Sequence, residues 1–128
     1  MRNLYNDLPE KLAIYPEDYT KETKHFVLYV DDNLISALTL IKKKIKPSDP
    51  ESCQIRGMGT IKEFCGRGYA SILINYLSKN LKKKKVKIIW CNSRISAINF
   101  YKKNKFEEVG LSFEIKSIGA HQKVLRYL

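Results

Sequence analysis

Apolar residues recur at regular spacing along most of the chain, and their pattern predicts a mixed α/β domain. Two early runs, Lys24–Val30 and Leu34–Ile41, are rich in apolar and β-forming residues and flank the polar turn Asp31–Asn33. Runs of this kind around a short turn are typical of a β-hairpin. The preceding stretch, Met1–Thr23, is weakly patterned, and its leucines fit one or two short helical turns broken by prolines.

In the middle of the chain the spacing of apolar residues changes from a strand pattern to a helix pattern. Gln54–Ile61 reads as a strand, and Lys62–Gly68 reads as a tight turn that carries two glycines. From Tyr69 the apolar residues are spaced as on one face of a helix, which we expect to end near Leu81. The cluster Lys82–Lys85 suits that end, because cations interact favourably with the negative pole of a helix.

The last third of the chain predicts a buried strand, a short helix and a terminal pair of strands. Strands covered on both faces are nearly continuous apolar runs, and a serine before a helix is a common N-cap. The expected segments are strand Val86–Cys91, loop Asn92–Ile95, N-cap Ser96, helix Ala97–Lys103, and strands Phe106–Ile115 and Gln122–Leu128 joined through Ser117–His121. We find no repeat or linker and expect a single domain over residues 1–128.

Length and cysteine content narrow the class of protein. A chain of 128 residues can bury a core without disulfides or metal. Its three cysteines have no CxxC or Cys/His clustering, so we expect reduced thiols and no metal site. No apolar run approaches the roughly 20 residues of a membrane span. The N-terminal residues lack the apolar core of a signal peptide, which favours a cytoplasmic protein without membrane association.

The chain is strongly basic, with 24 Lys and Arg against 13 Asp and Glu and a formal net charge of +11. A field of this size attracts polyanions. The lysines gather in Lys42–Lys46, Lys82–Lys87 and Lys102–Lys105. These clusters fall at predicted element ends with few interleaved aromatic residues, so we favour ordinary surface usage over a nucleic-acid surface.

The strand, glycine turn and helix of the central stretch are a way to build an anion site. Backbone amides of the turn and the positive pole of the helix bind an anion, and glycine allows it to approach the backbone closely. The dinucleotide fingerprint GxGxxG would need a third glycine where Ser71 stands. The nucleotide-triphosphate loop GxxxxGK[ST] has no match in the chain.

The turn Cys65–Ala70, CGRGYA, resembles the acyl-coenzyme A loop of the GNAT superfamily of acetyltransferases. Gly68 and Ala70 match the fixed positions of that loop, whereas Cys65 stands where the family usually has Arg or Gln. A second resemblance covers Ser96–Gly110, where the family has a helix with Ala and a Phe/Leu–Tyr pair followed by Gly–Phe. The matching residues are Ala97, Phe100, Tyr101 and Phe106, with Lys105 in place of the common Gly and Arg94 in place of a common Asn.

Further segments resemble a small bacterial subgroup of uncharacterised GNAT proteins, in the same order along the chain. They are YPEDY around Glu17 and Asp18, His25–Phe26, Ile55–Gly59 (IRGMG), Trp90–Arg94 (WCNSR) and Ser117–His121 (SIGAH). The resemblance extends from about Arg2 to Leu128. It implies an α/β GNAT-like acyl-CoA N-acyltransferase fold, a mixed central sheet flanked by helices, from which we expect the first strand to be missing.

The resemblance implies an enzyme that moves an acetyl group from acetyl-CoA to an amine by direct attack, without metal. It assigns pantetheine and pyrophosphate contacts to Met58, Gly59, Thr60, Ile61, Cys65, Gly66, Arg67, Gly68, Tyr69, Ala70, Ser71 and Arg94. Tyr101 is expected to protonate the leaving thiolate, because a phenol stays protonated at neutral pH. The Glu that many members use as base is absent from Gln54–Ile61, and His121 is the candidate on the substrate side.

Two other functions stay open at this point. The chain could be a degenerate GNAT fold that binds CoA without turnover, or a small basic nucleic-acid-binding domain. The acceptor, a small-molecule or peptide amine, is not specified by the sequence. A cationic acceptor would need carboxylates in its pocket, and the candidates are Glu17, Asp18, Glu63, Glu107, Glu108 and Glu114. GNAT proteins are often dimers, so a homodimer whose neighbour supplies the missing edge strand is a further expectation.

Overall fold

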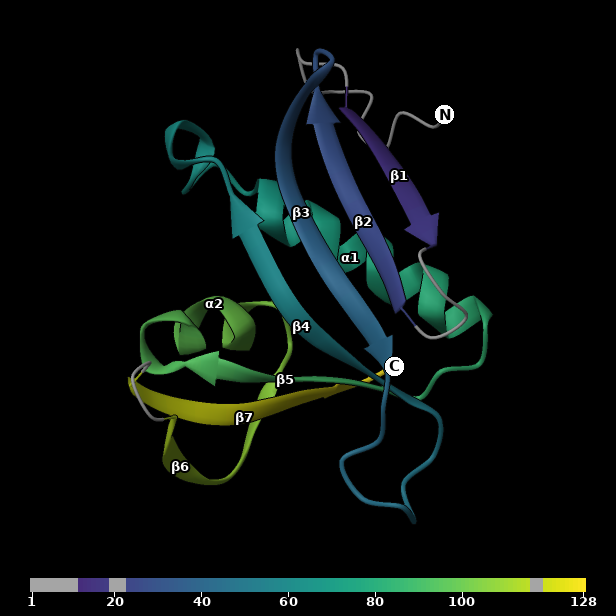
Figure 1. Cartoon of the computed structure of the whole chain (residues 1–128), viewed down its shortest axis with the longest axis vertical. Coiled ribbons are helices and arrows are strands. Elements are labelled where there is room, and N and C mark those ends of the chain that lie inside the picture. Colours follow the sequence, from purple (N-terminus) through teal and green to yellow (C-terminus); the bar gives the residue numbers. More distant parts are fainter. Residues whose placement is uncertain (1–11, 19–22, 116–118) are drawn as a thin grey trace.

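A seven-stranded mixed sheet organises the computed structural model, which describes residues 12–18, 23–115 and 119–128 (Figure 1). Across the sheet the strand order is β1-β2-β3-β4-β5-β7-β6. The elements are β1 (Leu12–Asp18), β2 (Thr23–Val30), β3 (Asn33–Lys42), β4 (Ser52–Thr60), α1 (Tyr69–Lys83), β5 (Ile88–Arg94), α2 (Ile98–Lys103), β6 (Glu107–Ile115) and β7 (Gly119–Tyr127). Short 3-10 turns at Lys62–Phe64 and Ile95–Ala97 precede the two helices.

Strands β1 to β4 form an antiparallel meander, and the predicted hairpin at Asp31–Asn33 is confirmed as β2 and β3. Asp31 and Asp32 have φ values of 49° and 70°, the left-handed conformation of tight hairpin turns. Strand β1 corrects two expectations. Part of the stretch assigned to helical turns is a strand, and the edge beside β2, expected to lack its first strand, is paired over Leu12–Asp18.

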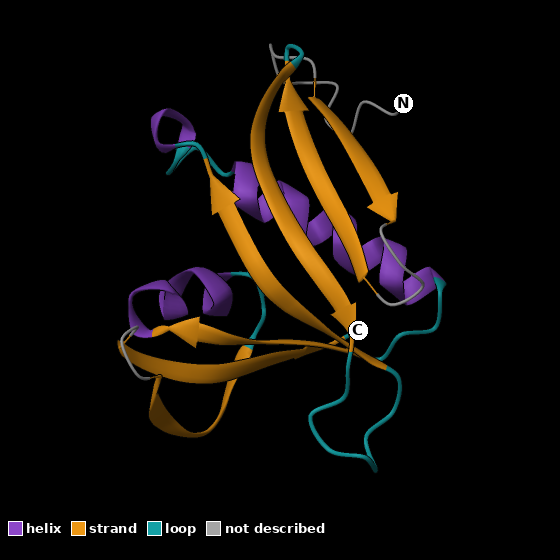
Figure 2. Ribbon diagram, viewed as in Figure 1, coloured by secondary structure: helices purple, strands orange, loops and turns teal. Residues whose placement is uncertain are grey.

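Helix α1 packs on one face of β2, β3 and β4, as Figures 1 and 2 show from the opposite face. The predicted helical period is confirmed: Leu73, Ile74 and Leu77 have no exposed surface. They pack in one cluster with Phe26 and Leu38 of the sheet. Burial of side chains this large contributes roughly 1.5–3 kcal/mol each. In the described part of the chain, no helix covers the other face of β2 to β4 (Figure 2).

The C-terminal part differs from prediction before α2, whereas the predicted end of this helix at Lys103 is confirmed. Strand β5 continues through Asn92 to Arg94, where a loop was expected, because β7 pairs with its whole length. Ser96 is not an N-cap: it lies within a 3-10 turn, and α2 begins at Ile98 with Ala97 at the cap position and no side-chain cap. Lys105, which follows α2, has a left-handed φ of 73°.

The sheet is interrupted between β4 and β5. These parallel strands pair at three rungs, from Ser52 opposite Ile88 to Gln54 opposite Trp90. Beyond that point β4 remains paired with β3, and β5 with β7, while the two strands diverge toward Thr60 and Arg94 (Figure 1). The gap therefore opens at the carboxyl ends of two parallel strands, where α/β folds commonly bind ligands.

Candidate active site

The predicted glycine turn lies directly before α1 and leaves the start of this helix uncapped. Gly66 and Gly68 have φ values of 79° and 86°, a backbone conformation that favours glycine. Gly68 is the N-cap of α1 and supplies no side-chain hydrogen bond, and the first turn contains no acidic residue. Amides of an uncapped first turn, together with the helix dipole, make a site for an anion.

A cavity of about 280 Å³ opens at this helix start. It is lined by Thr60, Phe64, Cys65, Gly66, Gly68, Tyr69, Ala70, Ser71, Phe100 and Lys103. The guanidinium of Arg67 lies 5.0 Å from the centre of the Phe64 ring, at the side of the turn. Donor amides, a nearby Arg and a Lys in the wall are the groups that a pyrophosphate requires, so the residues fit a coenzyme with that group.

The edge of β4 that faces the gap carries backbone groups suited to a ligand with amides. Gly59 turns its carbonyl toward β3, where Ser36 Oγ donates to it at 2.9 Å. Successive residues of a strand direct their N–H and C=O groups to alternate sides, so those of Met58 face β5. Because β5 has diverged here, an extended ligand can pair with this edge as an added strand.

Cys65 does not replace the Arg or Gln of the family, and its backbone amide donates to the Lys62 carbonyl at 3.2 Å. Its side chain is exposed, and Sγ lies 3.6 Å from the carbonyl oxygens of both Thr60 and Ile61. These weak contacts hold the thiol against the end of β4. The position that usually carries Arg or Gln in the family is therefore filled by a group that brings no charge to the anion site.

Tyr101 is buried on the helix-covered side of β5, and its hydroxyl hydrogen-bonds with the thiol of Cys91. Cys91 is the first residue of β5 beyond the last rung shared with β4, so this hydroxyl lies at the base of the gap. Phe100 and Phe106 fix the ring from two sides, each with its ring centre 5.2 Å away. Burial raises the pKa of Tyr101 well above 10, and burial raises that of Cys91 to about 12.

His121 is buried in β7 on the other face of the sheet. It pairs in register with Arg94 at the end of β5 and with Phe113 of β6, whose ring centre is 6.1 Å from its own. Its Nδ1 lies 2.9 Å from the carbonyl oxygen of Gly119. A carbonyl only accepts hydrogen bonds, so Nδ1 carries the proton and Nε2 keeps the lone pair in the neutral ring.

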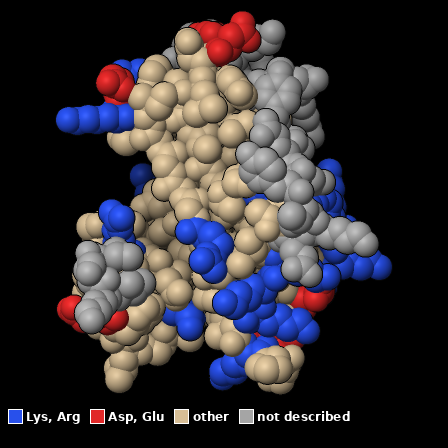
Figure 3. Space-filling view, in the orientation of Figure 1, with Lys and Arg blue, Asp and Glu red and all other residues tan. Residues whose placement is uncertain are grey.

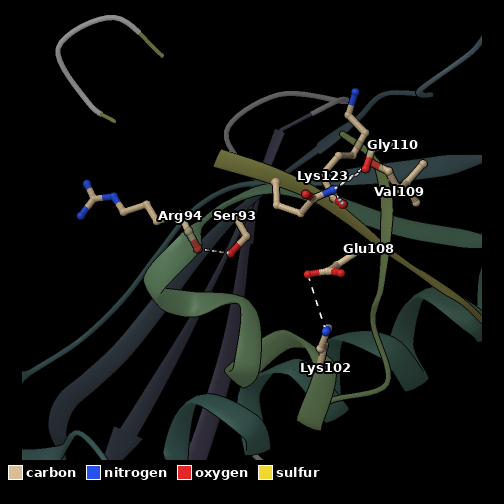
Figure 4. Close-up of polar contacts among 8 residues, drawn as sticks. Ser93, Arg94, Lys102, Glu108, Val109, Gly110 and Lys123 are labelled. Carbon is tan, nitrogen blue, oxygen red and sulfur yellow. Dashed lines mark hydrogen bonds and ion pairs between the residues drawn. The ribbon is translucent and has the colours of Figure 1, made fainter. Parts of the chain in front are cut away.

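The structure does not place all predicted site residues together. Side chains of a strand alternate between faces, so Cys91, beside Tyr101, and Arg94, beside His121, lie on opposite faces of β5. Arg94 does not line the cavity, and its side chain extends away from the neighbouring polar contacts (Figure 4). Its carbonyl accepts a hydrogen bond from Ser93 Oγ at 2.8 Å.

Several residues that shape this site lie outside the motifs that the sequence analysis identified. Asn104 Nδ2 donates to Ser71 Oγ at 3.1 Å and to the Phe100 carbonyl at 2.9 Å, which joins the end of α2 to the start of α1. Lys103 enters the cavity wall. Gln54, on the last shared rung of β4 and β5, has a buried Oε1 that no described residue contacts through a hydrogen bond. Only Asn104 had a sequence cue, since asparagine is common at helix ends.

Comparison with known proteins identifies the family. Residues 1–106 match the family model described as Acetyltransferase (GNAT) family, and the chain therefore belongs to this family. It is also 28% identical over 109 residues to the uncharacterized N-acetyltransferase YitI of Bacillus subtilis (strain 168). That alignment covers 84% of this chain and 72% of the relative. The predicted family, α/β fold class and acetyltransferase class are confirmed.

Solved structures show the same fold at low identity. An IAA acetyltransferase from Bacillus cereus superposes with a TM-score of 0.72 at 12% identity, over 92% of this chain and all of the other. A GNAT family acetyltransferase from Elizabethkingia anophelis with acetyl-CoA bound gives 0.71 at 14%, over 91% and 98%. Arabidopsis thaliana Naa50 in complex with a bisubstrate analogue gives 0.68 at 22%, over 81% and 72%.

Two features are absent from the described part of the chain. No group of three or more His, Cys, Asp or Glu side chains is arranged to hold a metal ion there. Within the same residues, no helix has the length and apolar character needed to cross a membrane.

Proposed function

We propose that this chain acetylates an amine with acetyl-CoA, by direct attack of the amine within the gap between β4 and β5. The observation that carries the proposal is the divergence of these strands beside an uncapped, glycine-lined helix start. When bound, acetyl-CoA supplies an activated thioester carbonyl. The amides of the turn and first helical turn, with Arg67 and Lys103, hold its phosphates, and the backbone edge at Met58 aligns its pantetheine arm.

Tyr101 acts as the general acid that protonates the departing thiolate. Its hydroxyl lies at the base of the gap, and three neighbours, Cys91, Phe100 and Phe106, restrict its position. Because burial holds its pKa above the ordinary value, the phenol stays protonated throughout the neutral range. A positioned acid of this kind typically contributes about 10²–10⁴ in rate.

His121 is the base on the acceptor side. Its Nδ1–H donates to the Gly119 carbonyl, so the lone pair of Nε2 accepts a proton from the ammonium of the acceptor, and the neutral amine that results attacks the thioester carbonyl. This assignment rests on the face it occupies, next to the mouth of the gap at Arg94. Glu17 and Asp18, two candidate carboxylates for a cationic acceptor, lie in β1, where their side chains fall outside the described residues.

The acceptor is a small-molecule or peptide amine. Naa50 carries a peptide-like bisubstrate analogue, which supports a peptide amine as one class to test. On the described face opposite α1, Gly57 and Gly59 of β4 have open space where a side chain would begin. Such a floor leaves room for an extended acceptor.

The first experiment is the shift in melting temperature on adding acetyl-CoA, with ATP and a short DNA duplex as polyanion controls at moderate salt. A ligand at 100 times its Kd adds about 2.7 kcal/mol, which corresponds to roughly 10 °C for a domain of this size. We expect a shift with acetyl-CoA alone. Equal shifts with all three ligands would show that charge alone is responsible and would contradict a specific coenzyme site.

Replacement of Tyr101 by Phe tests turnover. We expect kcat to fall by about 100-fold, with the Kd of acetyl-CoA changed by less than about threefold, because the lost group acts on the leaving thiolate. Tyr127→Phe is a matched control, since Tyr127 is 67% exposed on the far end of β7. An unchanged kcat in Tyr101→Phe would contradict the assignment of Tyr101 as the general acid. Coenzyme binding without turnover in the unmodified chain would indicate the degenerate alternative.

A further inference from the structure

Four polar residues of β5 and β7 lie together beside the mouth of the gap. Asn92 pairs in register with Lys123, and Arg94 pairs with His121. Residues two apart on a strand share a face, and paired residues of neighbouring strands project to the same side. The four side chains therefore occupy two neighbouring positions on each strand, on the face that carries His121. We refer to them as the β5–β7 quartet.

Two members of the quartet are cations that can contact the same small group. Diagonal neighbours on paired strands are about 7–8 Å apart, which is within reach of side chains as long as those of Arg94 and Lys123. Arg94 is exposed, and its guanidinium extends away from its polar neighbours (Figure 4). Neither cation takes part in the ion pairs of the described side chains. Both charges are therefore available to a ligand.

Lys123 reaches from β7 across to β5 and lies near the base of the gap. Its Nζ is 5.3 Å from the centre of the Trp90 ring. Trp90 is opposite Gln54, on the last rung that β4 and β5 share. The ring is 4% exposed, and its N–H donates to the Lys43 carbonyl at 2.8 Å, so its position is fixed. The amine of Lys123 is thus held over a rigid aromatic surface on the acceptor side of the gap.

Two of the carboxylates that a cationic acceptor could use lie on the opposite face of the sheet. Glu108 is 3.6 Å from Lys102 of α2, as Figure 4 shows. Glu114 pairs in register with Ala120, which precedes His121 in β7. Because side chains alternate along a strand, Glu114 projects away from His121. Neither carboxylate is therefore placed to bind an acceptor beside the quartet.

Glu107 shares the face of the quartet but lies farther from the mouth of the gap. It pairs with Leu125, two residues beyond Lys123 in the direction away from His121, and it makes no ion pair. Lys and Arg cover more of the lower half of Figure 3 than Asp and Glu do, and Figure 1 places β5 and β7 in that half. The field beside the quartet is positive and repels a purely cationic acceptor.

We propose that the acceptor is an amine that also carries a carboxylate or phosphate group. This inference rests on the proposed function and specifies its substrate class. His121 accepts the proton of the ammonium, while Arg94 and Lys123 bind the anionic group through charge-assisted hydrogen bonds. The Asn92 amide adds a neutral donor between them. Residues two apart on a strand are separated by roughly 7 Å, which suits an amine and an anion joined by a short carbon chain.

Matched product analogues test this binding without any catalysis. 4-Acetamidobutanoate carries the acetylated amine and a carboxylate, and 4-acetamidobutanamide differs only in a neutral amide. In NMR titrations of the full chain we expect the carboxylate to shift the amide signals of Asn92, Arg94 and Lys123. It should bind at least about tenfold more tightly than the amide, because charge-assisted hydrogen bonds are the stronger ones. 3-Acetamidopropylphosphonate, compared with the carboxylate, shows which anion is preferred.

Single variants separate the quartet from the general charge of the protein. Lys123→Gln and Arg94→Gln are each expected to weaken carboxylate binding by at least about tenfold, with less than about a threefold change for the neutral amide. Lys123→Arg keeps the charge and should retain most of the affinity. Lys79→Gln removes one charge from an exposed position of α1 and should change it by less than about threefold. The Kd of acetyl-CoA should stay within about threefold in all four variants.

Turnover distinguishes this inference from the proposed function. At saturating acetyl-CoA, kcat/KM for 4-aminobutanoate should exceed that for 4-aminobutanamide and for 1,4-diaminobutane by at least about tenfold. If acetyl-CoA neither binds nor reacts while the carboxylate analogue binds at the quartet, the proposed function fails and the anion site is confirmed.

Three results would overturn the inference while leaving the proposed function intact. The first is acetylation of amines without a preference for those that carry an anion. The second is equal affinity for the carboxylate and amide analogues. The third is an equal loss of carboxylate binding in Lys79→Gln and Lys123→Gln, which would mean that net charge alone attracts the probe.

Discussion

One lysine after each helix has a backbone conformation that usually belongs to glycine. Lys85 follows α1 with φ 65°, and Lys105 follows α2 with φ 73°. Helices commonly end in a left-handed residue, and glycine has no steric penalty there. The Gly that GNAT proteins commonly carry where Lys105 stands thus has a structural explanation in this fold.

Lys105→Gly is expected to stabilise the protein by roughly 0.5–1 kcal/mol. The steric cost of a left-handed side chain, about 1–2 kcal/mol, exceeds the entropy that glycine loses on folding. Urea denaturation measures the difference. Lys79→Gly, an exposed position inside α1, is the control and should destabilise by about 1 kcal/mol. A loss of stability in Lys105→Gly would show that the lysine side chain, and not its backbone, governs this turn.

Sequence reasoning succeeded with single residues where local rules apply and failed where tertiary contacts decide. Gly66 and Gly68 were correctly read as turn residues, because their need for positive φ is local. The position of Ser96 before an apolar helix predicts an N-cap, but the chain forms a 3-10 turn there. The buried Gln54 Oε1 was not predictable, because its burial depends on its place between β3 and β5.

At the scale of elements, the start of α1 and the end of α2 are joined by one side chain. Asn104 is 6% exposed, and its amide bridges Ser71 Oγ and the Phe100 carbonyl. Arg126 also donates to the Asn104 carbonyl at 3.4 Å. The distance between the anion site and the helix that carries Tyr101 is therefore set in part by this residue.

Asn104→Ala is expected to cost about 1–3 kcal/mol of stability and to weaken acetyl-CoA binding, because it removes the bridge and leaves the helix end without its side-chain donor. A double-mutant cycle with Ser71→Ala isolates the bridge. We expect a coupling energy of about 0.5–1.5 kcal/mol from the two single variants and the double variant. Strict additivity of the two changes would mean that the contact does not hold the helices together.

Elements whose apolar residues are regularly spaced were predicted from the sequence. Strands whose extent depends on pairing with a neighbouring strand were not. The α1 pattern and the hairpin of β2 and β3 follow from side-chain spacing. β1 contains Pro16 within LAIYPED, which argues against a strand in isolation but is tolerated at a sheet edge. Likewise, β5 extends to Arg94 only because β7 continues beside it.

At the scale of the whole molecule, buried thiols make the folded state sensitive to alkali. Burial raises the pKa of Cys53 to about 11 and that of Cys91 to about 12, from an ordinary value near 9. Between pH 9 and 11 the native chain keeps protons that the unfolded chain has released. Since the unfolded state binds fewer protons, the free energy of unfolding decreases as pH rises.

We expect this decrease to approach 1.4 kcal/mol per pH unit for each thiol once the pH passes 9. Denaturant titrations at pH 7, 9 and 10 measure the slope. Cys53→Val should reduce it, whereas Cys65→Ser should leave it unchanged, because Cys65 is exposed. If Cys53→Val and the unmodified chain lose stability in parallel, the alkaline sensitivity has another source.

The fold brings together lysine clusters that are far apart in the sequence. Lys42–Lys46 and Lys82–Lys87 read as separate element ends, and only the fold reveals that they are neighbours. The opposite pole carries the hairpin aspartates 31 and 32. The lysine clusters thus give the molecule a basic end that lies away from the coenzyme turn.

The short junction of β4 and β5 makes the width of the gap mechanically soft. Three rungs lie at one end of both strands, and β4 continues for six residues past Gln54. At about 3.3 Å per residue these six residues span roughly 20 Å, so a slight change of twist at the junction becomes a large displacement at Thr60. A ligand that hydrogen-bonds to the edges of β4 and β5 facing the gap would hold the two strands at a fixed separation. Part of its binding free energy would then offset the cost of stiffening the sheet.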